Sequence, residues 1–135
     1  MTEAYIVDAV RTPTGKRGGG LAEVHQADLG AHVIREVVER NDLDPLAVDD
    51  VVFGCVDNVG PQACDIARTA WLAAGLPEAI PGTTVDRQCG SGQQAVSFAA
   101  MGDGRPPRPG RGGRRAEHEH DPHRHGTRGG QAPRP

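Results

Sequence analysis

The stretch GTTVDRQCGSGQQAVSFAAM, residues 82–101, predicts a strand, a turn and a helix in direct succession. Its first part, residues 82–88, contains neighbouring β-branched side chains, which favour a strand. Its last part, residues 90–101, is rich in residues that favour a helix. Cys89 stands between the two parts and is followed by three small residues. The stretch therefore places a thiol at a strand-to-helix turn, a unit from which α/β proteins are built.

Strands and helices alternate upstream of this stretch as well. Residues 3–10 form a short apolar run, and the glycine-rich segment 11–20 ends it, which predicts a buried strand followed by a loop. An amphipathic helix is expected from about Asp28 to Asn41, because apolar residues recur there at the helical spacing: Leu29, Val33 and Val37.

The middle of the chain adds a second strand and a second helix. Residues 44–50 predict a short helical turn, and residues 50–56 predict a strand. An alanine-rich helix is expected over residues 62–77, where Gly75 and Pro77 end it. This alternation predicts an α/β fold of the layered type with largely parallel strand pairing.

The composition changes after Met101. Residues 1–100 carry fourteen acidic and seven basic side chains, whereas residues 101–135 carry four acidic and eight basic ones. Only Ala116 and Ala132 are apolar within residues 102–135, too little to offset the entropy of ordering that segment. We therefore expect one domain over residues 1–101 and a disordered tail, rich in Arg, Gly, Pro and His, over residues 102–135.

Several classes of protein are not expected. The first ten residues contain neither a basic leader nor a long apolar run, so the sequence predicts a cytoplasmic protein without a membrane partner. The spacing of Cys55, Cys64 and Cys89 fits neither a disulfide framework nor a zinc motif. We expect no metal site and no nucleic-acid partner.

Cys89 is the candidate catalytic residue. The first turn of a helix favours negative charge, so a thiolate at this turn is stabilised, and Gly90 and Gly92 allow a substrate carbonyl to approach the backbone. On geometry alone, a buried structural cysteine is an equally good interpretation. Cys55 and Cys64 are interpreted as structural, because Cys55 falls within an expected strand and Cys64 on an expected helix, neither with a glycine-lined opening.

Three segments of the sequence resemble the thiolase family. VDRQCGSGQQAV, residues 85–96, resembles the nucleophile segment of thiolases, and VDAVRTPTGKRGGGL, residues 7–21, resembles their N-terminal strand and loop. DIARTAWLAAGLPEAIPGTTV, residues 65–85, follows the family in order and spacing. The resemblance covers residues 4–101, and three ordered motifs are far more specific than a lone Cys-Gly pair.

The resemblance implies an acyltransferase of the acetyl-CoA acetyltransferase or 3-ketoacyl-CoA thiolase type. In thiolases a cysteine at the position of Cys89 is acylated by an acyl-CoA, and the acyl group then passes to the enolate of acetyl-CoA or to free CoA. Residues 1–101 would then be an incomplete N-terminal domain, with CoA thioesters as substrates, no bound cofactor, and a homo-oligomer for the full-length enzyme. The resemblance settles no role for Arg11, Lys16 or Arg68, for which loop solvation or a subunit contact is the interpretation.

Two motifs of the family do not occur in this sequence. Thiolases activate the nucleophile with a histidine in a Gly-His-Pro motif and handle the substrate proton with a second cysteine in a glycine-rich motif. His25 and His32 fall in the first helical region, where a solvated surface is expected. We therefore expect a truncated or frameshifted piece that is inactive alone; the alternative is a non-catalytic thiolase-like module that binds acyl-CoA or a partner subunit.

The tail has two further interpretations. Its histidines resemble a loose metal-binding tract, but their spacing fits no structural zinc pattern: His118, His120, His123 and His125. When the codons for residues 117–124 are read one nucleotide later, they permit Ser-Met-Ser-Thr-Ile-Pro-Ile. That product resembles a Met-Ser-x-x-Pro segment that thiolases have downstream of the nucleophile helix. We therefore interpret residues 102–135 as an out-of-frame translation.

Overall fold

A computed structural model describes residues 4–102, which fold into alternating helices and strands. All of these residues lie in one compact unit. The elements in chain order are α1 (Gln26–Arg40), a 3-10 turn (Pro45–Ala47), β1 (Val51–Gly54), a second 3-10 turn (Gly60–Gln62), α2 (Ile66–Ala73), β2 (Gly82–Val85) and α3 (Ser91–Gly102). The α/β fold class is confirmed. The expectations for the tail, namely disorder, the absence of a metal site and an out-of-frame origin, lie outside the described residues.

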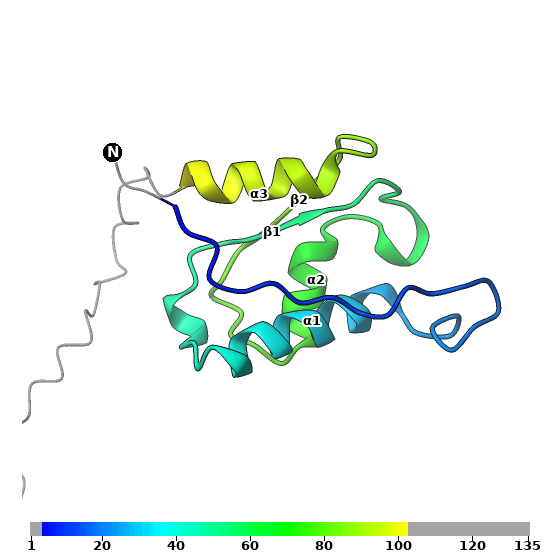
Figure 1. The fold of residues 1–135 in the computed structure, drawn as a ribbon, viewed down its shortest axis with the longest axis horizontal. Coiled ribbons are helices and arrows are strands. Elements are labelled where there is room, and N and C mark those ends of the chain that lie inside the picture. The colour runs from blue at the N-terminus through cyan, green and yellow to red at the C-terminus, as the bar shows by residue number, and fades with distance from the viewer. Residues whose placement is uncertain (1–3, 103–135) are drawn as a thin grey trace, which may run out of the picture. The chain divides into compact units, whose positions relative to one another are not determined.

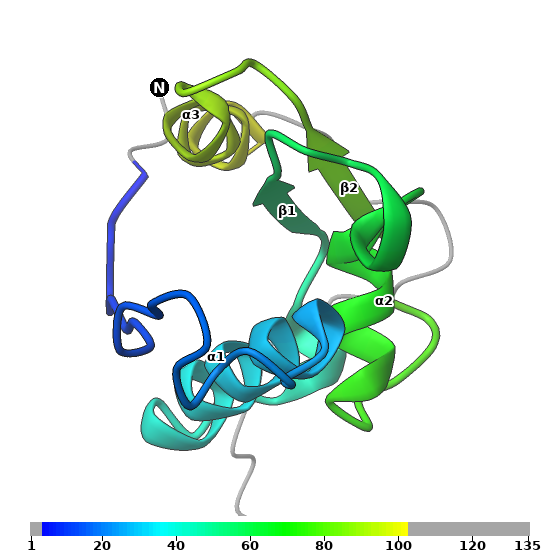
Figure 2. The same cartoon turned by 90° about the vertical axis from the view of Figure 1, so that its right-hand side faces the viewer.

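The two strands pair in parallel and form the middle layer. Val51 lies opposite Gly82, and Gly54 lies opposite Val85. Figures 1 and 2 show α3 on one face of this strand pair and α1 with α2 on the other. Both strands therefore end at the same edge, where the chain turns from β2 into α3.

The hydrophobic core lies on the face covered by α1 and α2. Its fully or nearly buried members come from both helices and from the segment before β2: Ile34, Ala70, Trp71 and Ile80. Trp71 is the largest of them and is only 2% exposed. Its indole N–H donates a hydrogen bond to the carbonyl of Pro77 at 2.8 Å, so its one polar atom is satisfied within the core.

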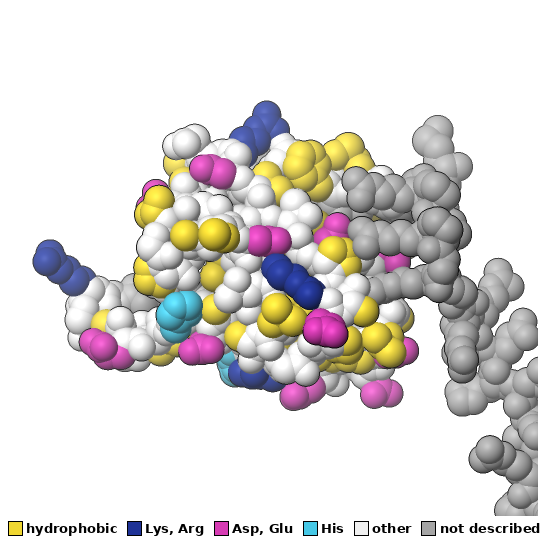
Figure 3. Space-filling model, turned by 180° about the vertical axis from the view of Figure 1, so that it is seen from behind, with side chains coloured by type: hydrophobic (Ala, Val, Ile, Leu, Met, Phe, Trp, Pro, Cys, Tyr) yellow, Lys and Arg dark blue, Asp and Glu magenta, His cyan; other side chains and the backbone are white. Residues whose placement is uncertain are grey.

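Helix α3 has an apolar surface that nothing in the described part of the chain covers. The helix contains no charged residue, and only Ser91 and Ala95 are buried in it. Val96, Phe98 and Met101 remain 58%, 45% and 64% exposed. Figure 3 shows hydrophobic side chains along the upper edge of the molecule, where α3 runs in Figure 1. A helix without charges is typical of a buried helix.

The strand expected over residues 3–10 is not formed. Residues 4–10 have no regular structure, and Tyr5, Ile6 and Val7 are 77%, 82% and 78% exposed. A strand needs a neighbour for its backbone hydrogen bonds, and the sheet within residues 4–102 has only two members, which pair with each other. The β-branched composition of the segment was therefore insufficient to make it a strand.

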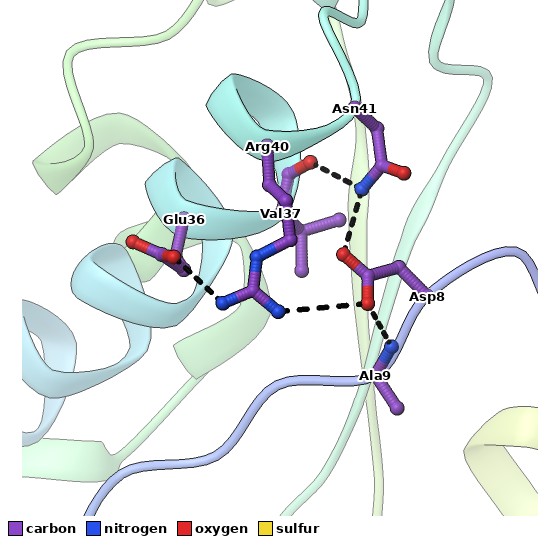
Figure 4. A network of polar contacts seen from close by, with 6 residues as sticks. All are labelled: Asp8, Ala9, Glu36, Val37, Arg40 and Asn41. Carbon is purple, nitrogen blue, oxygen red and sulfur yellow. Dashed lines mark hydrogen bonds and ion pairs between the residues drawn. The ribbon is translucent and has the colours of Figure 1, made fainter.

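Asp8 instead ties this segment to the end of α1 (Figure 4). The side-chain amide of Asn41 donates to the Asp8 carboxylate and to the carbonyl of Val37, both at 2.9 Å. Arg40 lies 3.7 Å from the same carboxylate and also pairs with Glu36 at 2.9 Å. The N-terminal segment is thus held by polar contacts at one point.

These contacts make a prediction about titration. The Asn41 amide, followed by the backbone N–H of Ala9, holds the pKa of Asp8 below its ordinary value of 3.8. Ionised Asp8 therefore stabilises the docked segment above its ordinary pKa, and that contribution is lost as the pH falls through the lowered value. Carboxyl titration by NMR should give a midpoint below 3.8, which Asn41→Ala should raise and Glu36→Gln should change less. An unchanged midpoint in Asn41→Ala would contradict this account.

Two helices begin at residues other than those expected. Helix α1 begins at Gln26, and Nδ1 of His25 accepts a hydrogen bond from the Ala27 N–H at 3.1 Å, so His25 caps the helix. Helix α2 begins only at Ile66, because Asp65 caps it by accepting from the Arg68 N–H. Cys64, expected on this helix, lies outside it.

Candidate functional site

Cys89 lies in the turn that joins β2 to α3, at the carboxyl end of the strand pair. Its side chain is exposed, and α3 begins two residues later at Ser91. The first N–H groups of a helix have no partner within the helix, and the helix dipole adds partial positive charge at that end. The structure thus places an accessible thiol two residues before the N-terminus of α3.

The backbone of this turn is tightly bent. Gln88, directly before Cys89, has a φ of +51°, which residues with a Cβ atom rarely adopt. Its N–H donates to the Asp86 carboxylate at 3.0 Å. The Gly90 N–H donates to the carbonyl of Arg87 at 3.0 Å, which closes the turn around Cys89.

Ser91 binds the same turn through its hydroxyl group. The hydroxyl accepts from the Arg87 N–H at 2.9 Å and donates to the carbonyl of Gln88 at 2.6 Å. The start of α3 also lies directly on β1: a Cβ atom added at Gly54 would lie 2.3 Å from the backbone nitrogen of Gly92. The turn, the helix and the strand are therefore in direct contact.

The other two cysteines lie elsewhere. All three are free thiols. Cys55 follows β1, is half-buried, and donates its backbone N–H to the carbonyl of Val85 at 3.0 Å. Cys64 is exposed with a φ of +66°, and its carbonyl accepts from Asn58 at 2.6 Å. Exposure does not single out Cys89, and neither does a place just before a helix, because Cys64 lies two residues before α2 as Cys89 lies two residues before α3. The start of α2 differs in that the Asp65 carboxylate caps it by accepting from the Arg68 N–H.

The structure does not bring the candidate basic residues to the Cys89 turn. Arg11 and Lys16 are exposed in the segment before α1. Arg68 lies on α2, and its guanidinium donates to the carbonyls of Ile80 and, at 2.5 Å, Glu78, so it fixes the segment before β2. His25 is the N-cap of α1, and His32 lies within that helix. Helix α1 lies across the sheet from α3.

A shallow groove open to solvent runs beside the turn. Residues 83–87 form one wall, and Gln94 and Phe98 of α3 form the other. No three metal-ligating side chains come together within residues 4–102. None of the helices described there combines the length and the hydrophobicity needed to cross a lipid bilayer.

Comparison with known proteins identifies the family. The sequence model of the thiolase N-terminal domain matches residues 4–102. The chain belongs to the thiolase family. The match begins at the tethered N-terminal segment and ends with α3, so it takes in all the helices and strands described above.

Several thiolases align with the same part of the chain. The steroid 3-ketoacyl-CoA thiolase FadA6 of Mycobacterium tuberculosis is 65% identical over 101 residues, which are 75% of this chain and 25% of the relative. The 3-oxoadipyl-CoA/3-oxo-5,6-dehydrosuberyl-CoA thiolase of Escherichia coli is 47% identical over 109 residues, 77% of this chain and 27% of the relative. The β-ketoadipyl-CoA thiolase of Acinetobacter baylyi is 48% identical over 101 residues, 74% of this chain and 25% of the relative. This thiolase chain spans about a quarter of the length of these curated relatives.

Two residues of the turn region were missed in the sequence. Ser91 was treated only as a small residue beside the thiol, although a serine at a helix start is a known signal for hydrogen bonding to a neighbouring backbone group. Gly54 ends β1, and a glycine within a strand signals the close approach of another backbone. Both residues contact the turn or the helix start that follows it.

Proposed function

We propose that this chain is the N-terminal piece of a thiolase-type acyltransferase, of the acetyl-CoA acetyltransferase or 3-ketoacyl-CoA thiolase type, in which Cys89 is the nucleophile. The observation that carries the proposal is an exposed thiol in the turn between β2 and α3, two residues before α3, within the segment that matches the thiolase N-terminal domain. The relatives named above are thiolases of CoA thioesters. We therefore propose acyl-CoA and CoA as the ligands, with no bound cofactor and a homo-oligomer for the full-length enzyme.

The proposed first step is the attack of the Cys89 thiolate on the thioester carbonyl carbon of an acyl-CoA. A sulfur–carbon bond forms to Cys89, the bond from that carbon to the CoA sulfur breaks, and CoA leaves as a thiolate that takes up a proton. In this proposal, backbone N–H groups at the start of α3 stabilise the negative charge that develops on the carbonyl oxygen. In the second step, the acyl group passes to the enolate of acetyl-CoA or to free CoA.

No histidine lies at the Cys89 turn among the described residues, 4–102. His25 is occupied in capping α1, and His32 is exposed on that same helix, across the sheet from α3. General-base assistance contributes about a hundredfold to ten-thousandfold in rate. We therefore propose that residues 1–101 are an incomplete domain and that the 135-residue chain is inactive alone.

The proposal includes the origin of the tail. If residues 102–135 are an out-of-frame translation, restoring the phase between the codons for Met101 and Gly110 should yield a longer open frame. That frame should contain a Gly-His-Pro motif and a second glycine-flanked cysteine. A cytoplasmic location remains part of the same proposal.

Differential alkylation of the three cysteines tests the assignment of Cys89. Near neutral pH, iodoacetamide should modify Cys89 faster than Cys64, which is also exposed, and faster than Cys55, which is half-buried. Peptide mapping by mass spectrometry gives the three rates in one sample. Equal rates for Cys89 and Cys64 in the folded chain would contradict an activated nucleophile and favour the alternative, a thiolase-like binding module.

A further inference from the structure

Ser91 is the one buried polar residue within residues 4–102, with 4% of its surface exposed. Its hydroxyl donates one hydrogen bond and accepts another, and both partners lie within the turn. Both partners are backbone groups that precede Cys89. The Ser91 hydroxyl therefore links the start of α3 to the backbone that precedes Cys89.

The Ser91 hydroxyl bonds the backbone just before and at Gln88, a residue with a positive φ. The N–H of Arg87 and the carbonyl of Gln88 are the groups that Ser91 contacts, and Gln88 has the positive φ of +51°. A residue with a Cβ atom stays in that conformation only when its surroundings hold it there. The Ser91 hydroxyl is such a constraint, and the Ser91 N–H adds a second bond to the Gln88 carbonyl at 3.1 Å.

The helix start that carries Ser91 is itself fixed on the sheet. Gly54 at the end of β1 leaves no room for a side chain, because an added Cβ atom would lie 2.3 Å from the carbonyl carbon of Ser91 and from the nitrogen of Gly92. Backbone packed this closely cannot shift without moving the strand. A chain of contacts therefore runs from β1 through Ser91 to the turn that holds Cys89.

We propose that Ser91 is a positioning residue for Cys89, whose hydroxyl keeps the thiol at the N-terminus of α3. This inference rests on the proposed function, since it concerns the same thiol. Without the hydroxyl, the Arg87 N–H loses its acceptor and Gln88 loses one of its constraints, so the turn relaxes. Cys89 then spends less time in the position that the turn gives it beside the start of α3, and its reactivity towards an electrophile falls.

The test compares alkylation rates in variants of the complete 135-residue chain, with Cys64 as the reference in the same molecule. Ser91→Ala should lower the ratio of the Cys89 rate to the Cys64 rate about threefold to tenfold. Ser91→Thr, which keeps a hydroxyl, should restore the ratio to within about twofold of the original chain. Ser97→Ala is the matched control, because Ser97 on the same helix bonds only the Gln93 carbonyl, away from the turn, and should leave the ratio unchanged.

The outcomes separate this inference from the proposed function. Equal rates for Cys89 and Cys64 in the original chain would overturn both. A fast Cys89 whose ratio is unchanged in Ser91→Ala would overturn the role of Ser91 and leave the nucleophile in place. If Ser91→Ala loses its circular dichroism signal, the isosteric pair Ser91→Thr and Ser91→Val replaces it. Equal ratios in that pair would overturn the proposal, and a lower ratio in the valine variant would support it.

Discussion

Replacing Cys89 with alanine, in the longer protein that the proposed change of reading frame after Met101 would encode, should lower the rate of acetoacetyl-CoA thiolysis by about a millionfold. The reason is that the acyl group would lose the Cys89 sulfur, the atom that accepts it in the proposed first step, and the reaction cannot proceed through an acyl-enzyme without that atom. The fold should persist, because Cys89 is exposed and belongs to a turn rather than to the core. Steady-state thiolysis and circular dichroism measure the two expectations separately.

Two matched variants and the original chain serve as controls for this experiment. Cys64→Ala and Cys55→Ala remove thiols that lie outside the turn between β2 and α3, so each should retain most of the thiolysis activity. The 135-residue chain itself should show no thiolysis above background. Turnover by this chain at rates typical of enzymes would contradict the proposal that further residues are required.

Trp71→Ala should lower the free energy of unfolding by about 3–5 kcal/mol. The indole is 2% exposed and packs in the cluster with Ile34, Ala70 and Ile80, so its removal leaves a cavity between α1, α2 and the sheet. A domain of this size is stable by only about 5–15 kcal/mol, so the variant would be close to unfolded. Urea unfolding followed by circular dichroism gives the change.

Trp71→Phe separates packing from hydrogen bonding at the same position. It keeps an aromatic ring in the core but leaves the Pro77 carbonyl without its indole donor, and it should therefore lose less, about 1–3 kcal/mol. Equal losses in the two variants would mean that the hydrogen bond rather than the buried ring stabilises this part of the core. A loss below about 1.5 kcal/mol in Trp71→Ala would contradict the account of the core.

The strand-turn-helix unit around Cys89 could be predicted from the sequence because its signals are local. The β-branched run predicted β2, the small residues predicted the turn, and the helix-forming segment predicted α3. The start of β2 agrees with the expected residue, its end lies three residues earlier, and both ends of α3 lie one residue later. The parallel pairing of β1 with β2 followed from a helix between them, since parallel strands need such a crossover.

The expected N-terminal strand shows the limit of local signals. Residues 4–10 have the composition of a strand, yet Tyr5, Ile6 and Val7 are exposed and the segment is held by Asp8 against Arg40 and Asn41. Composition does not say whether a pairing partner is present. A contact between residues more than thirty positions apart, such as Asp8 with Asn41, has no signature in either segment.

The candidate site was predicted in part. The position of Cys89 at the start of a helix followed from the order of the elements, and the structure places it there. The contacts that brace the turn did not follow, because the positive φ of Gln88 and the two hydrogen bonds of the Ser91 hydroxyl depend on three-dimensional geometry. The close approach of Gly54 to Gly92 joins segments far apart in the sequence and was missed for the same reason.

The location of the acyl group tests the central claim, that Cys89 is the acyl-carrying nucleophile, most directly. The frame-restored protein would be mixed with acetyl-CoA, quenched in acid, digested, and mapped by mass spectrometry. The account predicts the added mass of one acetyl group on the peptide that contains Cys89, and its loss when free CoA is added before the quench. An acetyl group on Cys55 or Cys64, or on no cysteine while thiolysis proceeds, would contradict it.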